Sequence, residues 1–378
     1  MKKGVMLFYG FYALAHIYIG FRLTGLLKLS ALGTGLLWAT LFLLFFAFLL
    51  GRKISSSAKL ANIFLKTGAY WFGISYYLVL FLLLGEALLF LHRRHPFLPP
   101  VFLATPRLSA LFLFCLLSLI LLWGAYQART VKIRSYKLAI AKPAGSLTSL
   151  HIAFAADLHL GSIITKKDLQ RFVKSLETLQ PDLILLAGDI IDGDAFTCRP
   201  MLPLLKKLQA PYGIYAVLGN HEYLNGQVQE ITALLTQAGI RVLRDEIVIL
   251  ANNLVLAGRD DNTSKTFTGK DRLSLNSLLT KADRRLPILL LDHQPIELDK
   301  ARTEGVDLHL SGHTHYGQLF PNSLITGKVF EVDWGYRQKE TLQILVTCGF
   351  GTWGPPLRIG SQSEIIDLTI TFADPIIP

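Results

Sequence analysis

Four long apolar stretches in the first third of the chain constrain its fold more than any other feature. They cover roughly residues 4–21, 30–50, 69–91 and 108–126. Each approaches the ~20 residues that an α-helix needs to cross a bilayer. A buried core helix would keep one polar face, whereas residues 41–50 are apolar on every side. The sequence therefore predicts four transmembrane helices.

The few polar groups in these stretches favour an anchor over a transporter. Lys2 and Lys3 precede the first stretch, as in a signal peptide, but this stretch is long, contains His16 and lacks a small-residue cleavage site. We interpret it as an uncleaved span and His16 as a packed histidine. Glu86 lies late in the third stretch, where we expect it to meet Arg93. The sequence therefore predicts a four-span membrane domain over residues 1–126.

The positive charge of the chain belongs to its membrane part. Residues 1–149 carry 16 Lys and Arg and one acidic residue, whereas residues 150–378 carry 22 basic and 26 acidic residues. The basic pI near 9.5 is therefore no sign of nucleic-acid binding. With the N-terminus inside, the inner segments hold 11 Lys and Arg and the outer loops hold 5. This asymmetry predicts a multi-pass protein of the cell membrane with a cytoplasmic soluble domain.

Residues 127–149 are basic and are interpreted as a linker beside anionic lipid headgroups. The three cysteines, Cys115, Cys198 and Cys348, have no paired or metal-finger spacing, so no disulfide framework is expected. Cys348 is interpreted as a buried packing residue.

The rest of the chain alternates short apolar runs with amphipathic segments, which indicates an α/β domain over residues 150–372. The expected strands cover residues 151–156, 183–187, 214–218, 254–257, 288–291 and 307–310. The expected helices cover residues 167–179, 201–208, 228–238 and 273–282.

Five polar clusters follow the ends of these strands, where an α/β sheet presents its binding loops. They are Asp157-Leu158-His159, Gly188-Asp189-Ile190-Ile191-Asp192, Gly219-Asn220-His221-Glu222, Asp292-His293-Gln294-Pro295 and Gly312-His313-Thr314-His315. Residues i and i+2 of an extended segment share a face, so Asp157 with His159, and His313 with His315, can aim two ligands into one cavity. The glycines at 188, 219 and 312 allow sharp turns close to a compact site.

This set of clusters resembles the calcineurin-like metallophosphoesterase superfamily, whose pattern is D-x-H, GD-x-x-D, GNH-D/E, H and GH-x-H. The resemblance covers about residues 150–372 and implies a layered α/β sandwich with two mixed sheets. Residues 349–358 also resemble the end of the membrane-associated bacterial branch and of transmembrane proteins with a metallophosphoesterase domain. Two residues depart from the pattern: Glu222 replaces the commoner Asp, and Tyr316, in place of Gly, is expected to narrow the site.

The resemblance implies two divalent metal ions, with Mn, Fe and Zn all compatible with nitrogen and oxygen ligands. One metal takes Asp157, His159 and His315, the other takes Asn220, His293 and His313, and Asp189 bridges both. Two such ions and two carboxylates leave about +2, which attracts a phosphate and acidifies a bridging water. His221 is placed by the resemblance to stabilise or protonate the leaving oxygen.

Several other polar residues are interpreted as structural and not as ligands or catalytic residues. Asp192 is either a turn residue or orienting acceptor, or a direct participant, and Glu222 is expected to orient a ligand. Residues 259–261 are expected to form a solvated charged loop. His151 and His309 are expected to be core or edge histidines.

The sequence predicts a membrane-anchored, dinuclear-metal phosphoesterase that hydrolyses a phosphate ester or pyrophosphate. Its expected partners are membrane lipids and a phosphorylated, lipid-linked substrate resembling UDP-2,3-diacylglucosamine, with no nucleic acid. The alternatives are a membrane scaffold or sensor with a degenerate phosphatase domain, and a nuclease or cyclic nucleotide phosphodiesterase. A degenerate domain would lack ligands, and here none is missing.

Overall fold

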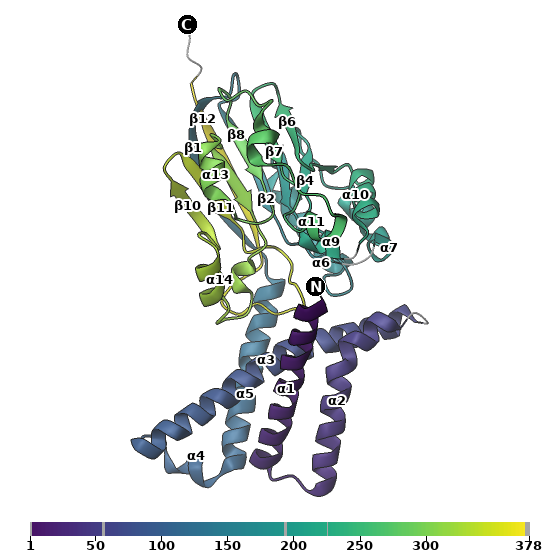
Figure 1. Ribbon diagram of the computed structural model, residues 1–378, viewed down its shortest axis with the longest axis vertical. Coiled ribbons are helices and arrows are strands. Elements are labelled where there is room, and N and C mark those ends of the chain that lie inside the picture. Colours follow the sequence, from purple (N-terminus) through teal and green to yellow (C-terminus); the bar gives the residue numbers. More distant parts are fainter. Residues whose placement is uncertain (1, 55–56, 193–194, 225, 375–378) are drawn as a thin grey trace. The chain divides into compact units, whose positions relative to one another are not determined.

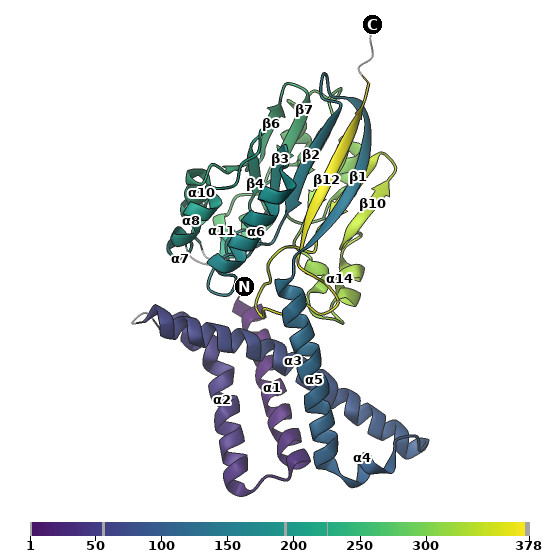
Figure 2. The same cartoon turned by 180° about the vertical axis from the view of Figure 1, so that it is seen from behind.

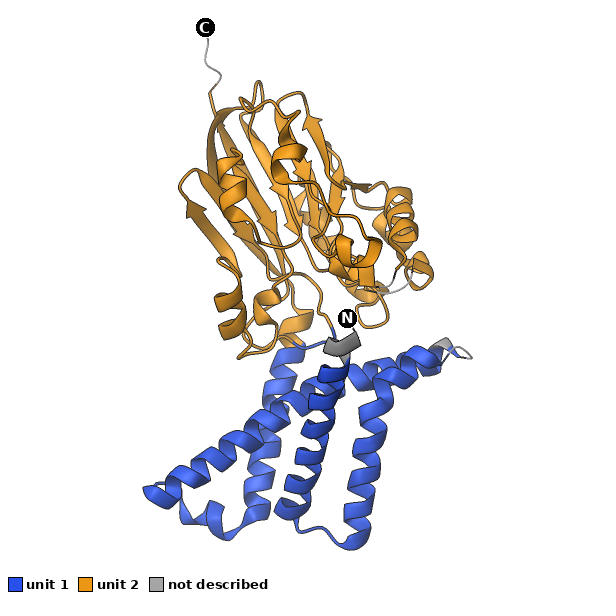
Figure 3. Cartoon of the chain, in the orientation of Figure 1, with its two compact units in different colours: residues 1–125, 354–357 blue, residues 126–353, 358–378 orange. Residues whose placement is uncertain are grey.

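The structure is a computed structural model that describes residues 2–54, 57–192, 195–224 and 226–374. The chain forms two compact units (Figure 3). One unit comprises Met1–Ala125 and Gly354–Leu357 and is named the membrane unit after its predicted spans. The other comprises Tyr126–Trp353 and Arg358–Pro378 and is named the catalytic unit after its predicted site.

The membrane unit is helical, and four of its helices are long and apolar enough to cross a bilayer. Its helices are α1 (Lys2–Leu27), α2 (Ala31–Lys53), α3 (Ala58–Arg94), α4 (Pro100–Ala104) and α5 (Pro106–Arg129). The four candidate spans overlap the four predicted stretches, which confirms the predicted helical part of the fold. Helix α3 is longer than predicted, because residues 58–68 continue the helix although they include Lys59 and Lys66.

Small residues allow α2 and α3 to pack closely. A Cβ atom on Gly51 would lie 2.6 Å from the backbone nitrogen of Leu65, and one on Gly68 would lie 2.5 Å from that of Phe48. Larger residues at either glycine would push the helix backbones apart. Small residues are typical of helix interfaces in membranes, where close van der Waals packing drives association.

Two polar side chains of the membrane unit, His16 and Glu86, have partners within the chain. Trp71 Nε1 donates to His16 Nε2 at 2.7 Å, and His16 Nδ1 lies 2.7 Å from the carbonyl oxygen of Tyr12. His16 is therefore a packed histidine, as predicted. Glu86 pairs with Arg22, at 2.7 Å between Oε1 and Nε, instead of the expected Arg93. The packing of α1 against α3 brings Arg22 within reach.

The catalytic unit is built on two six-stranded mixed sheets (Figures 1 and 2). In the first sheet the order is β1 (Lys132–Pro143), β12 (Glu364–Ala373), β2 (Ser149–Ala155), β3 (Leu183–Ala187), β4 (Ile214–Val217) and β5 (Arg241–Val242). In the second the order is β10 (Gly335–Lys339), β11 (Leu342–Val346), β9 (Leu308–Ser311), β8 (Ile288–Leu291), β7 (Leu254–Gly258) and β6 (Glu246–Leu250).

Three apolar layers join these sheets to each other and to the helices. The central layer joins inward side chains of both sheets, including Phe154 and Leu185 from the first and Leu256 and Leu310 from the second. The outer face of the first sheet packs against α6 (Lys166–Leu179), α8 (Leu202–Leu205) and α10 (Val228–Gln237). The outer face of the second packs against α12 (Leu275–Leu279) and α13 (Leu298–Thr303). The predicted layered α/β sandwich with two mixed sheets is confirmed.

The segment interpreted as a linker contains the long strand β1. This strand pairs in parallel with β12 along most of its length, and the two lie side by side in Figure 2. Its outward positions carry Lys132, Arg134 and Lys137, so its composition resembles a solvated linker. Such charges are common on edge strands, where they discourage pairing with other chains. The catalytic unit therefore begins before residue 150.

Candidate metal centre

The seven predicted ligands lie on five loops, and each loop follows the carboxyl end of a strand. Asp157 and His159 follow β2, Asp189 follows β3, Asn220 follows β4, His293 follows β8, and His313 and His315 follow β9. Both sheets therefore contribute, and their loops meet at the end of the sandwich where α/β folds bind ligands.

The structure brings all seven side chains together. Three groups have ligand atoms within 4.8 Å of one another: Asp157, His159 and His315; His159, Asp189 and His221; and Asp189, His293 and His313. Asn220 joins the last group, since its Oδ1 lies 3.1 Å from His293 Nε2. Asp189 lies between the two halves, with Oδ2 at 3.2 Å from His293 Nε2 and 3.9 Å from His159 Nε2. The geometry therefore suits a bridging carboxylate.

The chemistry of this cluster fits divalent cations. The ring nitrogens of His159 and His315 approach each other to 3.0 Å, and those of His293 and His313 to 3.2 Å. Asp157 and Asp189 are buried, and among the described residues neither has an ion pair with Lys or Arg. Buried carboxylates without a cation are costly. Divalent cations held by these nitrogen and oxygen atoms would compensate both charges.

The pKa values of two histidines favour the neutral rings that metal ligands require. Burial, assisted by the charge of His221, lowers the pKa of His159 to about 3. Burial, assisted by the charge of His293, lowers the pKa of His313 to about 4. Both rings are therefore neutral at physiological pH, with a lone pair available for coordination.

The loops hold the ligands in a backbone conformation that non-glycine residues rarely adopt. Five of the seven have a positive φ: Asp157 (56°), His159 (49°), Asp189 (49°), His313 (71°) and His315 (49°). Such strain persists only where the surrounding structure enforces it, and it concentrates at functional sites.

Glycines make room for the two carboxylates. A Cβ atom on Gly219 would lie 2.2 Å from Asp189 Oδ1, and one on Gly312 would lie 2.4 Å from Asp157 Oδ2. Gly188 has a φ of +79°. The three glycines thus serve the turns and close approaches that the sequence predicted.

Glu222 organises two of the ligand loops. Its buried carboxylate accepts hydrogen bonds from the backbone N–H groups of Asp189 (3.1 Å), Ile190 (2.7 Å), Ile191 (2.9 Å) and Gly219 (2.7 Å). Burial and the neighbouring charge of Asp189 raise the pKa of Glu222 to about 7. The expected orienting role fits this arrangement, because the carboxylate ties the loop after β3 to the loop after β4.

His221 lines the pocket and is held by Asp192. Its Nδ1 lies 2.7 Å from Asp192 Oδ1, and its Nε2 lies 4.0 Å from Asp189 Oδ2. Burial opposes the charged ring, but the hydrogen bond to Asp192 and the charge of Asp189 raise the pKa of His221 to about 9. This contact favours the interpretation of Asp192 as an acceptor that orients another side chain, here His221, over that of a direct participant.

The interpretation of residues 259–261 as a solvated loop is wrong, since all three are buried. Arg259 pairs with Asp292 at 3.2 Å and with Glu297 at 2.8 Å, and Gln294 Nε2 donates to Asp261 at 3.0 Å. These contacts flank His293 and fix the segment that carries it. The charged sequence did not indicate burial, because the ion-pair partners of Arg259 lie 33 and 38 residues away along the chain.

Arg358 is a buried residue whose role the sequence did not predict. Its Nη2 donates to the carbonyl oxygens of Cys348 (2.7 Å), Gly349 (2.9 Å) and Gly351 (2.6 Å) and lies 3.4 Å from His315 Nδ1. The resemblance of residues 349–358 was the one available signal. The guanidinium shapes the loop behind His315.

Three other expectations concern side chains outside the ligand set. Tyr316 does not line the pocket; its ring packs on Trp334 at 4.9 Å between centroids, so the expected narrowing is wrong. His151 pairs with Asp367 at 2.6 Å, and His309 is buried within β9. Both are strand histidines, as expected. Cys348 is buried, also as expected.

A pocket of about 330 Å³ opens above the cluster. Its polar side includes Asp189, Asn220, His221, His313 and His315, and its other side includes Ile325, Phe330 and Trp353. Among the described residues that line it there is no Lys or Arg. A phosphate bound here would therefore depend on cations held by the ligands.

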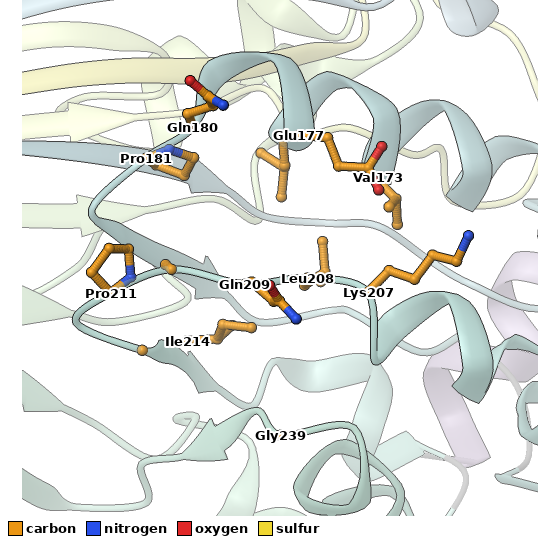
Figure 4. A pocket seen from close by; sticks show the side chains of 13 residues that line it. Val173, Glu177, Gln180, Pro181, Lys207, Leu208, Gln209, Pro211, Ile214 and Gly239 are labelled. Atoms are coloured by element: carbon orange, nitrogen blue, oxygen red, sulfur yellow. The ribbon is translucent and has the colours of Figure 1, made fainter.

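A larger cavity of about 1050 Å³ lies elsewhere in the catalytic unit. Figure 4 shows Val173 and Glu177 on its helical side, facing the loop that carries Lys207, Leu208 and Gln209. This loop precedes β4, so the cavity lies at the amino ends of the strands. The cavity contains no ligand cluster among the described residues.

The chain is similar to several known proteins. The family profile described as calcineurin-like phosphoesterase matches residues 150–317. An uncharacterized metallophosphoesterase from Aquifex aeolicus is 34% identical over 255 residues, which cover 66% of this chain and 96% of that protein. A transmembrane protein with metallophosphoesterase domain from Bos taurus is 32% identical over 242 residues, 60% of this chain and 54% of that protein. The crystal structure of a dimetal phosphatase from Danio rerio has 15% identity and a TM-score of 0.37, covering 61% of this chain and 100% of that chain.

The catalytic unit has the fold and donor set of a metal-dependent phosphoesterase. The chain belongs to the calcineurin-like metallophosphoesterase family. It spans about half the length of the bovine transmembrane relative that it matches.

Proposed function

We propose that this protein is a membrane-anchored phosphoesterase that uses two divalent cations to hydrolyse a phosphate ester or pyrophosphate. The observation that carries the proposal is the convergence of seven ligand side chains around Asp189 at the base of a pocket. Asp157, His159 and His315 would hold one cation, and Asn220, His293 and His313 the other, with Asp189 shared by both. Bound cations would supply charge neutralisation for the phosphate and acidify a water molecule.

His221 is the proposed general acid. Asp192 holds its Nδ1, which leaves Nε2 as the atom that carries a proton on the pocket side. The Asp192 carboxylate accepts from Nδ1 and so stabilises the protonated ring. The proton can then pass from Nε2 to the departing oxygen, which becomes an alcohol instead of an alkoxide.

The membrane location and the substrate class belong to the same proposal. Four candidate spans support a multi-pass membrane protein, and the excess of Lys and Arg in the inner segments supports a cytoplasmic catalytic unit. The apolar side chains of the pocket support a lipid-linked phosphate, such as one resembling UDP-2,3-diacylglucosamine. The absence of Lys and Arg among the described lining residues, together with the acidic charge of residues 150–378, speaks against nucleic acid.

The test is the metal content and hydrolytic activity of the purified full-length chain. Elemental analysis should find about two Mn, Fe or Zn ions per chain, and a chelator should abolish hydrolysis of an aryl phosphate or a bis-aryl phosphodiester. Re-addition of the metal should restore it. A chain that holds two metals but hydrolyses no phosphate in a library of lipid and soluble phosphates would contradict the proposal and favour the scaffold.

A further inference from the structure

Exposed apolar side chains concentrate around the mouth of the metal pocket. Between Lys132 and Asp374, eleven large apolar side chains of the described residues are exposed. Five of them lie on three short helices, and a sixth, Trp353, lines the pocket itself. The helices are α7 (Ala195–Cys198), α9 (Asn220–Leu224) and α14 (Ser323–Val329). The other exposed apolar side chains are spread over the rest of the unit.

We name these six residues the apolar rim: Phe196, Leu224, Leu324, Ile325, Val329 and Trp353. Their exposed fractions run from 38% for Trp353 to 78% for Phe196. Large apolar side chains that gather on one surface, unlike scattered ones, mark an interaction site. The rim is therefore a candidate docking surface.

The rim is continuous with the site that the metal ligands form. Helix α9 begins with Asn220 and His221, which line the pocket, and ends with Leu224. Ile325 and Trp353 belong to both the rim and the pocket wall. Helices α7 and α14 lie at the same end of the sandwich in both views (Figures 1 and 2), and Figure 1 shows α9 at this end too. This is the end where the strands deliver the ligands. Whatever covers the rim therefore also meets the mouth of the pocket.

The charges on the rim helices indicate what kind of partner covers them. Helix α14 carries Lys328 and no acidic residue, and the 3₁₀ turn after α7 begins with the exposed Arg199. Apolar side chains with neighbouring basic residues are typical of segments that lie at the interface of an anionic bilayer. The four candidate spans in the same chain require a membrane in any case.

We propose that the apolar rim binds the interface of an anionic lipid bilayer, so that the metal pocket opens onto the headgroup layer. The catalytic unit then reaches its substrate while the hydrocarbon chains of that substrate remain in the membrane. Partial burial of the rim replaces water at its apolar side chains with acyl chains and headgroups. This inference deepens the proposed function, but lipid contact is measured without turnover.

Lipid contact can be measured on the full-length chain in nanodiscs of phosphatidylcholine and phosphatidylglycerol. Cys115→Ser removes the exposed native thiol, while Cys198 and Cys348 are buried. Leu324→Cys and Val329→Cys then carry an environment-sensitive fluorophore on the rim. Ile249→Cys and Leu273→Cys are exposed controls outside the rim, with side chains that are 49% and 46% exposed. Ile249 pairs with Val255 near the start of β7, at the end of the sheet away from the ligands.

The rim labels should be quenched by lipids spin-labelled near the headgroup, by at least about twofold more than the controls. The controls should be quenched by aqueous iodide instead. Iodide quenching of the rim labels at the level of the controls would overturn the proposal. Rim labels shielded from both quenchers would also overturn it, because a second copy of the chain or another protein would then cover the rim.

A second measurement separates lipid contact from damage to the site. Leu324→Glu with Val329→Glu should lower turnover of a long-chain phosphate in bilayers on the order of tenfold, the effect of exposing one Leu-sized side chain. Hydrolysis of a soluble aryl phosphate should stay unchanged, as should both activities of the control Ile249→Glu. Equal losses on both substrates would contradict the proposal. Absence of all hydrolysis in the parent chain would refute the proposed function. The quenching experiment would still test lipid contact of the rim independently of activity.

Discussion

Acidic side chains are compensated differently in the two units. In the membrane unit, the carboxylate of Glu86 has the guanidinium of Arg22 at 2.7 Å and the hydroxyl of Tyr18 at 2.8 Å. In the catalytic unit, Asp157 and Asp189 are surrounded by imidazoles and have no Lys or Arg ion pair among the described residues. A carboxylate with a structural role is paired with a basic side chain of the same chain. A carboxylate at a binding site without such a partner is available to pair with a bound cation.

The contrast also holds within the catalytic unit. Asp292, the residue before His293, is buried, and Arg259 and Arg272 lie 3.2 Å and 3.1 Å from its oxygens. The lack of a Lys or Arg partner at Asp157 and Asp189, among the described residues, is therefore local to the cluster. It is no general property of this core.

The largest effect is expected at the shared carboxylate. Asp189→Ala should reduce turnover by more than about 10³-fold and lower the metal content from about two ions per chain to one or fewer, because one side chain serves both sites. Elemental analysis and aryl phosphate hydrolysis measure the two losses. Asp271→Ala is the matched control, since that aspartate is exposed and pairs with Lys265. Two tightly held metals in Asp189→Ala would show that the assigned bridge is wrong.

The next effect separates proton transfer from metal binding. His221→Ala should keep both metals and lose about 10²- to 10⁴-fold in turnover on phosphates with basic leaving groups, because a general acid matters most there. Activated aryl phosphates should lose less. Turnover across a series of leaving groups provides the measurement, with His151→Ala as a control histidine outside the site. A uniform loss across the series would exclude the acid role, and loss of metal would make His221 a ligand.

The sequence predicted six of the twelve strands of the sandwich. Six continuous apolar runs marked β2, β3, β4, β7, β8 and β9, because central strands covered on both faces contain few polar residues. Strand β1 was not predicted, because its charged residues are compatible with both an edge strand and a linker. Strand β10 is mostly polar, β12 alternates polar with apolar residues over much of its length, and β5 has two residues, so none of these three shows a long continuous apolar run. Strands β6 and β11 were missed although they contain short apolar runs.

At the site, the sequence predicted the residues that belong to short local motifs and missed those whose partners are distant along the chain. The ligands were found because each motif is local and carries its own chemistry. The surroundings of His293 were missed because Arg259 and Arg272 find Asp292 through the fold, across 33 and 20 residues of sequence. Arg358 was missed for the same reason, since its partners are backbone carbonyl oxygens that any sequence could supply.

His309, a buried histidine outside the ligand set, is expected to make the stability of the catalytic unit depend on pH. Burial, assisted by the charges of Arg259 and Arg272, lowers the pKa of His309 to about 3. In the unfolded chain His309 binds a proton below about pH 6.5, whereas in the folded chain it stays neutral down to about pH 3. The free energy of unfolding is therefore highest above pH 6.5 and falls as the pH drops from 6.5 towards 3. At pH 5 the loss is about 2 kcal/mol.

His309→Leu should remove this acid-side loss. The variant should match or exceed the parent chain at pH 5 and differ less at pH 7.5, because neither ring nitrogen of His309 has a hydrogen-bond partner to lose. Unfolding of metal-free protein at both pH values measures the difference, with His151→Leu as the control on an exposed pair. An unchanged pH profile in His309→Leu would show that another group causes the acid sensitivity.

The smallest effect is expected at the compensated carboxylate of the membrane unit. In Glu86→Gln the amide oxygen can still accept from Tyr18, and only the attraction to Arg22 is weakened. The side chains of Arg22 and Glu86 are 45% and 38% exposed, so their ion pair contributes about 1 kcal/mol or less. Unfolding of the membrane unit in detergent should change little, and metal content and hydrolysis should be unchanged. Combining Glu86→Gln with Arg22→Gln in a double-mutant cycle isolates the pair. Loss of hydrolysis in Glu86→Gln with both metals retained would contradict the comparison. It would show that Glu86, which has a counter-charge in the chain, contributes to activity. The membrane unit would then be more than an anchor.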